Sequence, residues 1–367
     1  MKKQLIFIIM MFMLCGCWDQ VNIQELQMSD VIGLDRNKKS DNENMKMSIA
    51  ISTLSEAHQG GGKPGMQLIS SEGYSLADNI EKLDYKLSGN LTFNQSRLYI
   101  FGKLFASNTP AEEMKILGRI PNSPLNANLA VFDEEVSELL KMEKIDSKTI
   151  ANYLVVMITN AIKYNYTPKV TLFQFILGKQ DPFKDFALPL IKKKGEDVQL
   201  GGSALFRAGN YTGIDLSMTS TKMAMLLKER KGGGVYLNTQ LDDSSYQIWI
   251  QKSKKHIHVK SSDNKISEIN LILHLQVNLI DSGKSNKALS QTKLDSIQKK
   301  LTDDLNQQAL QTVQTLQKAN CDFLELAREL HAYHYKEWEH MNWREDYPKL
   351  IIRPDIKLQI LNSGVML

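Results

Sequence analysis

The chain has 367 residues, a formal net charge of +4 and 42% hydrophobic residues, which is the composition of a soluble globular protein. The nearly balanced charge argues against a nucleic-acid-binding protein, because such proteins concentrate an excess of lysine and arginine. A chain of this length is too long for one hydrophobic core to keep growing, so we expect two or three domains.

The N-terminus has the pattern of a secretory signal. Lys2 and Lys3 form a basic start, and an apolar run extends from Leu5 to Leu14. A helix that spans a bilayer permanently needs about 20 apolar residues, so this shorter run is typical of a signal peptide. We expect residues 1–16 to be cleaved, which lowers the formal charge from +4 to +2. No later segment approaches a membrane-spanning length, so the rest of the chain should lie outside the membrane.

The end of this signal, Leu14-Cys15-Gly16-Cys17, resembles the bacterial lipobox. In a lipobox the last cysteine receives an S-diacylglycerol before cleavage makes it the first residue, and its amino group can also receive a fatty acid such as palmitate. Gly16 directly before Cys17 favours Cys17, although Cys15 stands where lipoboxes usually carry Ala, Ser or Thr. Two acyl chains hold a protein stably on a membrane. The alternative is an ordinary secretory signal with an incidental cysteine.

Cysteine usage also bears on stability and chemistry. Once Cys15 is removed and Cys17 carries lipid, Cys321 is the one remaining thiol. No intramolecular disulfide can then form, so packing alone should stabilise the fold. Cys321 has no assigned base and the chain has no Gly-x-Ser-x-Gly elbow, so nucleophilic catalysis is unsupported.

The first half mixes short strands with helices. The alternating apolar residues of Met45–Ser52 predict a half-buried strand. Ser75 is a suitable N-cap for a helix that carries Asp78 in its first turn. The other expected elements are strands at Arg97–Phe101 and Ala127–Phe132, and helices at Glu134–Lys141 and from Ser147 to Ala161.

A glycine-rich loop is expected at Gly60–Gly65. Its Gly-Lys pair invites comparison with a nucleotide-binding phosphate loop, which needs a glycine upstream at a fixed spacing and a Ser or Thr after the lysine. Ala57 and Pro64 occupy those positions, so we exclude a nucleotide site.

The middle of the chain shows neither the helical nor the strand period. It combines the acidic, aromatic and proline-containing stretch Asp181–Pro189 with the charged stretch Lys192–Asp197. We expect this segment to connect two α+β domains. These are an N-terminal domain over residues 17–190, with the option of two subdomains, and a C-terminal domain over residues 195–367.

The second half has consecutive strands followed by long helices. This irregular order predicts the α+β class, with mixed sheets flanked by helices. The expected elements are a hairpin around Ala208-Gly209-Asn210, a strand with one buried face at Ile269–Leu279, a long helix over residues 289–330, and closing strands at Leu350–Arg353 and Ile356–Ile360.

Histidines supply the best candidate metal ligands, because residues three apart share one face of a helix. The series lacks the His-Glu-x-x-His order of a hydrolytic zinc helix. We interpret its members, and two further histidines on a strand, as surface or partly packed side chains, and we expect no metal and no cofactor. The residues are His331, His334, Glu337 and His340, with His256 and His258 on the strand.

Aromatic residues gather near the C-terminus, and we favour core packing over an interface for them. Glutamines cover the outside of the long helix, which we interpret as a solvated face. The aromatic residues are Tyr333, Tyr335, Trp338, Trp343 and Tyr347.

Several landmarks in a fixed order cover essentially the whole chain. The most specific is the start Gly16-Cys17-Trp18-Asp19. The others are Val31–Asp35, Arg97–Gly102 with Ala106, Leu200–Arg207, Tyr211–Gly213, Cys321–Leu324, Trp338, Trp343 and Tyr347-Pro348. Together they resemble the C-subunit lipoproteins of bacterial spore germinant receptors, the Ger(x)C family.

This resemblance implies a lipid-anchored, multi-domain α+β protein that is not an enzyme. It would lie on the outer face of a bacterial cell membrane, the spore inner membrane, beside the A-type and B-type multi-span subunits of a nutrient germinant receptor. The small-molecule site is usually placed on those partners, so this subunit would serve assembly or signal coupling in germination. The main alternative is a solute-binding lipoprotein of a transporter, which usually has two α/β lobes of repeated strand-helix alternation.

Overall fold

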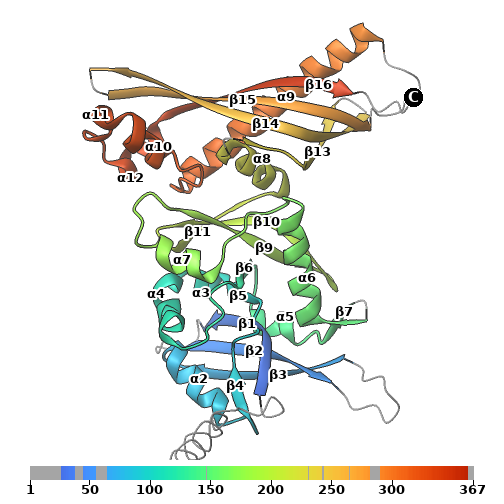
Figure 1. Ribbon diagram of the computed structural model, residues 1–367, viewed down its shortest axis with the longest axis vertical. Helices are drawn as coiled ribbons and strands as arrows, with labels where there is room; N and C mark the ends of the chain where they lie inside the picture. Colours follow the sequence, from blue (N-terminus) through green and yellow to red (C-terminus); the bar gives the residue numbers. More distant parts are fainter. Residues whose placement is uncertain are drawn as a thin grey trace, which may run out of the picture.

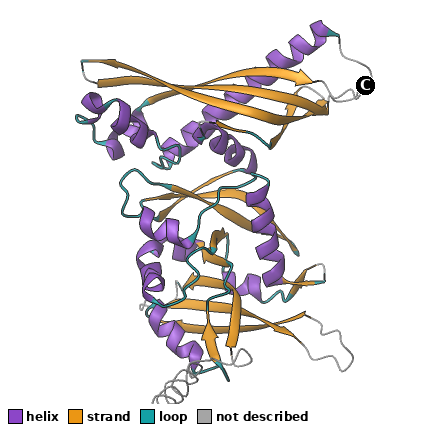
Figure 2. Cartoon of the chain, viewed as in Figure 1, coloured by secondary structure: helices purple, strands orange, loops and turns teal. Residues whose placement is uncertain are grey.

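A computed structural model describes residues 26–37, 44–54, 64–145, 147–229, 231–241, 244–263, 265–281 and 290–362. The predicted signal peptide, Cys17 and most of the glycine-rich loop lie outside these residues. The described chain forms two large sheets, one above the other, drawn in blue to green and in yellow to red (Figure 1). Helices accompany both sheets (Figure 2).

The first sheet has nine strands: β1 (Leu26–Arg36), β2 (Met45–Leu54), β3 (Pro64–Gly73), β4 (Asn90–Thr92), β5 (Leu98–Gly102), β6 (Asn128–Phe132), β9 (Phe186–Lys194), β10 (Asp197–Arg207) and β11 (Asn210–Leu216). They lie in the order β11-β10-β9-β6-β5-β1-β2-β3, and β4 pairs with β1. The central strands β1, β5, β6 and β9 run parallel, whereas the strands at both edges run antiparallel. The strand predicted at Met45–Ser52 is confirmed as β2.

Helices cover both faces of this sheet. On one face lie α2 (Leu76–Asp84), α3 (Lys103–Ser107), α4 (Pro110–Met114) and α7 (Leu172–Gly178), and on the other α5 (Val136–Leu140) and α6 (Ile150–Lys163). Every residue of β5 is consequently buried, as is usual for parallel strands that are covered on both faces.

Side-chain caps fix where the helices of this half begin. The cap of α2 is confirmed, because Ser75 Oγ accepts a hydrogen bond from the backbone N of Asp78 at 3.2 Å. Helix α5 is shorter than expected because Asp35 sets its start. The Asp35 carboxylate accepts hydrogen bonds from the backbone N of Val136 and Ser137 at 2.8 and 2.9 Å.

The start expected for α6 is wrong by a few residues. The helix begins at Ile150 with Thr149 as its N-cap. Ser147 instead has a left-handed φ of 63°. It lies in the turn of a small hairpin between β7 (Lys144–Ile145) and β8 (Lys148–Thr149), which leaves it unable to cap a helix.

The segment expected to connect the domains contains a central strand, so that expectation is wrong for β9. Leu188 of β9 pairs with Ala204 of β10, and Leu190 pairs with Val131 of β6. β9 shows no period because its first six residues are all buried, which places apolar side chains on both faces. The expected division at residues 190–195 falls within β9 and its turn to β10. The domain limits stay a prediction.

The hairpin expected around Ala208-Gly209-Asn210 is confirmed as the β10–β11 connection. Ala208 and Gly209 have φ of 48° and 80°, the left-handed region that favours glycine. Helix α8 (Met218–Lys228) follows this hairpin and leads to the second sheet.

The second sheet has five strands: β12 (Lys231–Gly232), β13 (Val235–Leu241), β14 (Ser244–Ser262), β15 (Lys265–Asp281) and β16 (Ile351–Asn362). β12 and β13 both pair with β14, and β15 lies between β14 and β16. β14 and β15 form a long antiparallel hairpin, whereas β16 runs parallel to β15. The two closing strands expected from the sequence are therefore one continuous strand.

One hydrophobic core joins this sheet to the helices of the second half. The alternation predicted for Ile269–Leu279 is confirmed, because its six inward apolar residues are at most 1% exposed. The helix expected over residues 289–330 ends earlier, since Asn320 and Glu325 adopt left-handed φ of 46° and 58°. The helices are α9 (Gln291–Lys318), α10 (Leu326–Tyr333), α11 (Tyr335–Trp338), α12 (Trp343–Asp346) and the 3-10 helix η4 (Tyr347–Lys349).

The architecture confirms the predicted α+β class, with mixed sheets and flanking helices. Among the described residues, no helix combines the length and the apolar character needed to cross a bilayer.

Candidate functional site at the junction of the sheets

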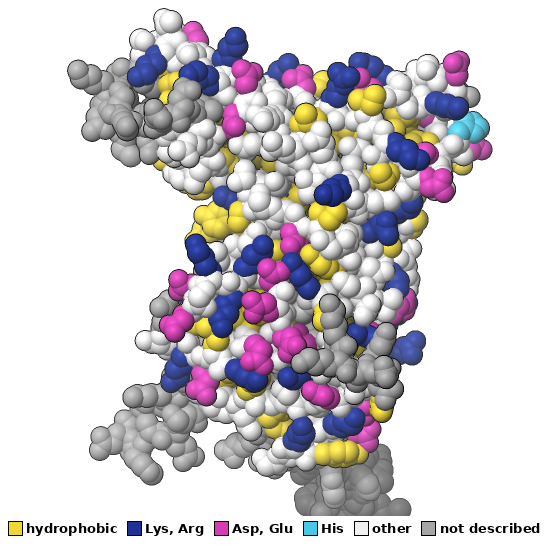
Figure 3. Space-filling model, turned by 180° about the vertical axis from the view of Figure 1, so that it is seen from behind, with side chains coloured by type: hydrophobic (Ala, Val, Ile, Leu, Met, Phe, Trp, Pro, Cys, Tyr) yellow, Lys and Arg dark blue, Asp and Glu magenta, His cyan; other side chains and the backbone are white. Residues whose placement is uncertain are grey.

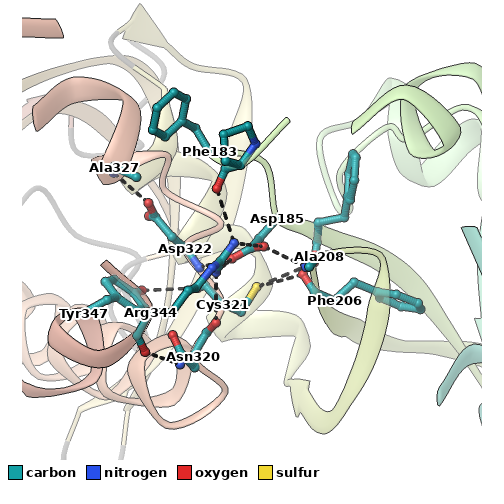
Figure 4. A network of polar contacts seen from close by, with 12 residues as sticks. Phe183, Asp185, Phe206, Ala208, Asn320, Cys321, Asp322, Ala327, Arg344 and Tyr347 are labelled. Carbon is teal, nitrogen blue, oxygen red and sulfur yellow. Dashed lines mark hydrogen bonds and ion pairs between the residues drawn. The ribbon is translucent and has the colours of Figure 1, made fainter. Parts of the chain in front are cut away.

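A buried polar network joins the first sheet to the C-terminal helices (Figure 4). Asp185 comes directly before β9, whereas Cys321 and Asp322 lie in the turn after α9. Arg344 belongs to α12. The network therefore lies where the two parts of the molecule meet.

Asp185 is the centre of this network. Its side chain is 1% exposed. It binds both terminal nitrogens of Arg344, with Nη1–Oδ2 at 2.6 Å and Nη2–Oδ1 at 3.0 Å. The backbone N of Ala208 and of Asp322 also donate to it, at 3.0 and 2.8 Å. A buried charge is tolerated only when it is paired and hydrogen-bonded. These contacts satisfy Asp185 and tie three other segments to its carboxylate.

Asp322 fixes the start of α10. Its carboxylate accepts hydrogen bonds from the backbone N of Leu326 and Ala327 at 2.9 and 2.7 Å, which are donors that a helix start leaves unpaired. Burial raises the pKa of Asp322 to about 7, because desolvation outweighs these two bonds and the attraction of Arg344. The carboxyl group therefore changes its charge near neutral pH.

We expect Asp322 to make the protein less stable as the pH rises. Its pKa of about 7 in the folded state exceeds the ordinary 3.8, so between these values only the folded state holds the proton. The stabilisation that Asp322 adds to the free energy of unfolding is complete below pH ~4. It is lost as the pH rises to ~7, and the free energy of unfolding falls by at most about 1.4 kcal/mol per pH unit. Denaturant titrations of wild type and Asp322→Asn test this.

The stabilities of wild type and Asp322→Asn are best compared between pH 6 and 8. Burial also raises the pKa of Asp35, to about 6, so Asp35 adds its own slope at lower pH. The Asp322→Asn variant should lose the fall in stability between pH ~6 and ~7. An identical slope in both proteins would show that Asp322 is ionised throughout.

Cys321 packs against the first sheet. Its Sγ donates to the carbonyl O of Phe206 at 3.4 Å and lies 3.7 Å from that of Phe186. The hydroxyl of Tyr347 donates to the carbonyl O of Cys321 at 3.2 Å. Burial, with help from Asp185, raises the pKa of the thiol. Cys321 is therefore held protonated as a packing residue, because thiols react as thiolates.

A second charge cluster lies beside the network. Glu325 Oε1 accepts from Lys184 Nζ at 2.6 Å and from Lys228 Nζ at 3.0 Å. Arg328 Nε lies 3.4 Å from Glu325 Oε2, and Arg328 Nη2 lies 2.5 Å from Asp181 Oδ2. Burial opposes ionisation of Glu325, but Lys228 and Lys184 outweigh it and lower its pKa to about 2. The cluster cross-links the segment before β9 to α8 and α10.

A cavity of about 520 Å³ opens next to this cluster. Lys184, Lys228 and Arg328 line its charged side, and Phe173 and Leu177 of α7, each 48% exposed, line an apolar side. Because the three cations already bind Glu325 and Asp181, this wall serves first to hold the two parts together.

The histidine series does not form one helix face. His334 has non-helical backbone angles between α10 and α11, so the helix is broken there. His331 packs its ring against Phe183 and Trp338, with centroid distances of 4.9 and 6.0 Å. Within the described ranges, no three His, Cys, Asp or Glu side chains are grouped so as to hold a metal ion.

The C-terminal aromatic residues divide into two groups. Trp343 and Tyr347 are 6% and 0% exposed, with ring centroids 5.0 Å apart, and Trp338 lies 5.6 Å from Trp343. Core packing is confirmed for this group. It is wrong for Tyr333 and Tyr335, which are 65% and 56% exposed on short surface helices.

Sequence reasoning missed the ion pair at the centre of the junction. Asp185 and Arg344 are separated by 159 positions, and neither belongs to a local motif. The nearest signals were Trp343 and Tyr347, which flank Arg344 and were correctly expected to pack in the core. Their burial placed Arg344 near the core but did not identify Asp185 as its partner.

Comparisons with known proteins cover both parts of the chain. Residues 19–193 match the family described as "Spore germination protein N-terminal domain". Residues 201–364 match the family described as "Spore germination B3/ GerAC like, C-terminal".

Two curated relatives align along almost their whole length. The chain is 24% identical over 367 residues to the spore germination protein GerQC of Bacillus cereus, covering 100% of this chain and 99% of that one. It is 23% identical over 416 residues to the spore germination protein KC of Bacillus subtilis (strain 168), covering 99% and 97%. The crystal structure of the GerBC protein matches with a TM-score of 0.58 at 15% identity, covering 92% of this chain and 99% of that one. That last likeness concerns the fold alone.

Proposed function

The chain belongs to the GerAC family of spore germination proteins, and we propose that it acts as the non-catalytic, lipid-anchored C subunit of a nutrient germinant receptor. The observation that carries this proposal is the match of both parts of the chain, over residues 19–193 and 201–364. The family is not a known enzyme family. The buried thiol and the hydrogen-bonded carboxylates of the junction support a structural role.

The junction suggests how such a subunit would work. Asp185 and Arg344 hold the first sheet to the C-terminal helices through a buried, two-point ion pair. Glu325 adds contacts from Lys184 and Lys228. A partner that moves one part of the molecule would therefore move the other as well. We propose that this stiffness serves assembly or signal coupling with the A-type and B-type multi-span subunits.

The anchor belongs to the same proposal. Cys17 would carry an S-diacylglycerol and hold the protein on the outer face of the spore inner membrane. Leu26, the first described residue, follows Cys17 by only nine positions. An extended segment of that length spans at most about 30 Å, so the first sheet would lie close to the bilayer.

A solute-binding lipoprotein of a transporter is not favoured. Such proteins usually have two similar α/β lobes, whereas the two sheets here differ in strand number and order. The family match of each part also points to germination.

Purification of the tagged chain from spore membranes tests the proposed function. We expect two multi-span proteins to co-purify with it, in amounts comparable to the chain itself. A thermal-shift screen of the purified chain with amino acids, sugars and nucleosides should show no strong stabilisation by any single solute. Recovery of the chain alone, together with strong stabilisation by one solute, would support the transporter lipoprotein instead.

A further inference from the structure

Among the described residues, one face of the second sheet is exposed and rich in basic side chains. The apolar residues of β15 point to the core shared with α9. On the opposite face, which we call the outer face, β14 presents alternating exposed side chains. These are Lys252, Lys254, His256, His258 and Lys260.

The strand register places basic residues directly opposite one another on the outer face. Lys254 pairs with His274 of β15, and His274 pairs with Lys357 of β16. His258, Asn270 and Arg353 form a similar row. The register therefore gathers basic side chains across three neighbouring strands.

Acidic residues neutralise only part of this charge. Glu268 binds Lys260 at 2.8 Å and Arg353 at 3.2 Å, and Asp355 binds Lys357 at 2.9 Å. Lys252 and Lys254 form no ion pair with any residue that the structure describes. Basic and acidic side chains also intermingle over the lower half of the rear surface (Figure 3).

Lys252 and Lys254 border a hollow of about 290 Å³. Lys252, Lys254, His274 and Lys357 line it. Gln276 and Gln359 also line it and are joined by a hydrogen bond of 3.1 Å. Several apolar side chains share the outer face with these groups, among them Ile351, which is 50% exposed. Cations, amides and scattered apolar groups together are typical of a protein-binding surface.

We propose that the outer face docks an acidic protein surface, whose carboxylates bind Lys252, Lys254 and Lys357. Charge complementarity of this kind steers association and selects the partner. A protein is a better candidate partner for the outer face than a bilayer is. The second sheet lies at the opposite end of the molecule from the start of β1, which pairs with β4 (Figure 1). The lipid proposed at Cys17 would hold that other end.

A binding assay with poly-L-glutamate as an acidic polypeptide tests the chemistry. The full chain carrying Cys17→Ala is compared with the same chain carrying Lys252→Glu, Lys254→Glu and Lys357→Glu. The matched control has Lys293→Glu, Lys299→Glu and Lys318→Glu, three exposed lysines of α9. We expect the outer-face variant to bind poly-L-glutamate at least tenfold more weakly than the parent, and the α9 control to bind it like the parent. Added salt should weaken the binding of the parent and of the control. Equal binding by both variants would refute the proposal.

Two further measurements test whether the variant is still folded and whether the partner is a protein or a membrane. A Lys→Gln version of the outer-face variant should melt like the parent and still bind poly-L-glutamate more weakly. Vesicles of phosphatidylglycerol and phosphatidylcholine should be bound no better than vesicles of phosphatidylcholine alone. A preference for the anionic vesicles over poly-L-glutamate would make the outer face a membrane surface and overturn the proposal.

The physiological arm rests on the proposed function. With Cys17 intact, the outer-face variant should co-purify at least tenfold less of the multi-span subunits than the α9 control does. If both variants retain the subunits equally, the docking proposal fails and the proposed function stands. If the wild-type chain captures no subunits, the proposed function fails, whereas the poly-L-glutamate result still decides the docking proposal.

Discussion

Replacing Arg344 by alanine is expected to lower the free energy of unfolding by about 3 kcal/mol, because removing one partner of a buried ion pair leaves the other uncompensated. Asp185 is 1% exposed and loses two of its four hydrogen bonds. Its two remaining donors, the backbone N of Ala208 and Asp322, satisfy it only partly. Urea titration of the chain carrying Cys17→Ala, at pH 7, measures the effect.

Two control variants make this result specific. Lys141→Ala removes an ion pair with Glu138 in which both side chains are more than half exposed, so it should change stability by no more than about 1 kcal/mol. The double variant Asp185→Asn with Arg344→Leu removes both charges and should recover much of the loss. An Arg344→Ala protein as stable as Lys141→Ala would mean that water enters the junction and solvates Asp185.

Replacing Cys17 by alanine is expected to release the protein from the membrane. The thiol that would carry the diacylglycerol is lost, and no helix of the described chain can cross a bilayer. The fold should survive, since the buried cores are built from residues 31–358 and Cys321 forms no disulfide. Fractionation of spores, together with labelling by a palmitate analogue, measures the outcome.

Germination through the receptor should also fall in the Cys17→Ala variant. Tethering two partners to one surface raises their effective concentration, typically by 10²–10⁴-fold in apparent affinity, and the variant loses this gain. Cys15→Ala is the matched control, because it changes the neighbouring thiol and should leave labelling, location and germination intact. Continued labelling and membrane association of Cys17→Ala would contradict the assignment and point to Cys15.

The sequence predicts elements well where one face meets water. The alternation from Ile269 to Leu279 predicts β15 because inward residues are apolar and outward ones are polar. The long helix α9 and the cap at Ser75 are predicted from similarly local patterns. Each of these signals lies within a few positions along the chain.

Elements buried on both sides give no such signal. Strand β9 was missed because neither of its faces meets water, so its residues show no period. The centre of the candidate site was missed for a different reason. The contact between Asp185 and Arg344 depends on tertiary structure, and a single charged residue in a sequence does not indicate which distant residue it meets. The sequence predicts part of the outer face, because it places His256 and His258 on a strand. It does not predict that Lys357 joins this face, because that depends on the parallel pairing of β16 with β15.

The parallel pairing of β15 with β16 also constrains biosynthesis. Domains fold as the chain emerges from its N-terminus, so the first sheet can be complete while β16 (Ile351–Asn362) is still inside the ribosome. Arg344 emerges equally late, and until it arrives Asp185 has no counter-ion. A product cut short before Arg344 would carry an unpaired buried carboxylate and an open edge on β15. Such a chain would be an easy target for proteases, so the junction can close only after synthesis has passed Arg344.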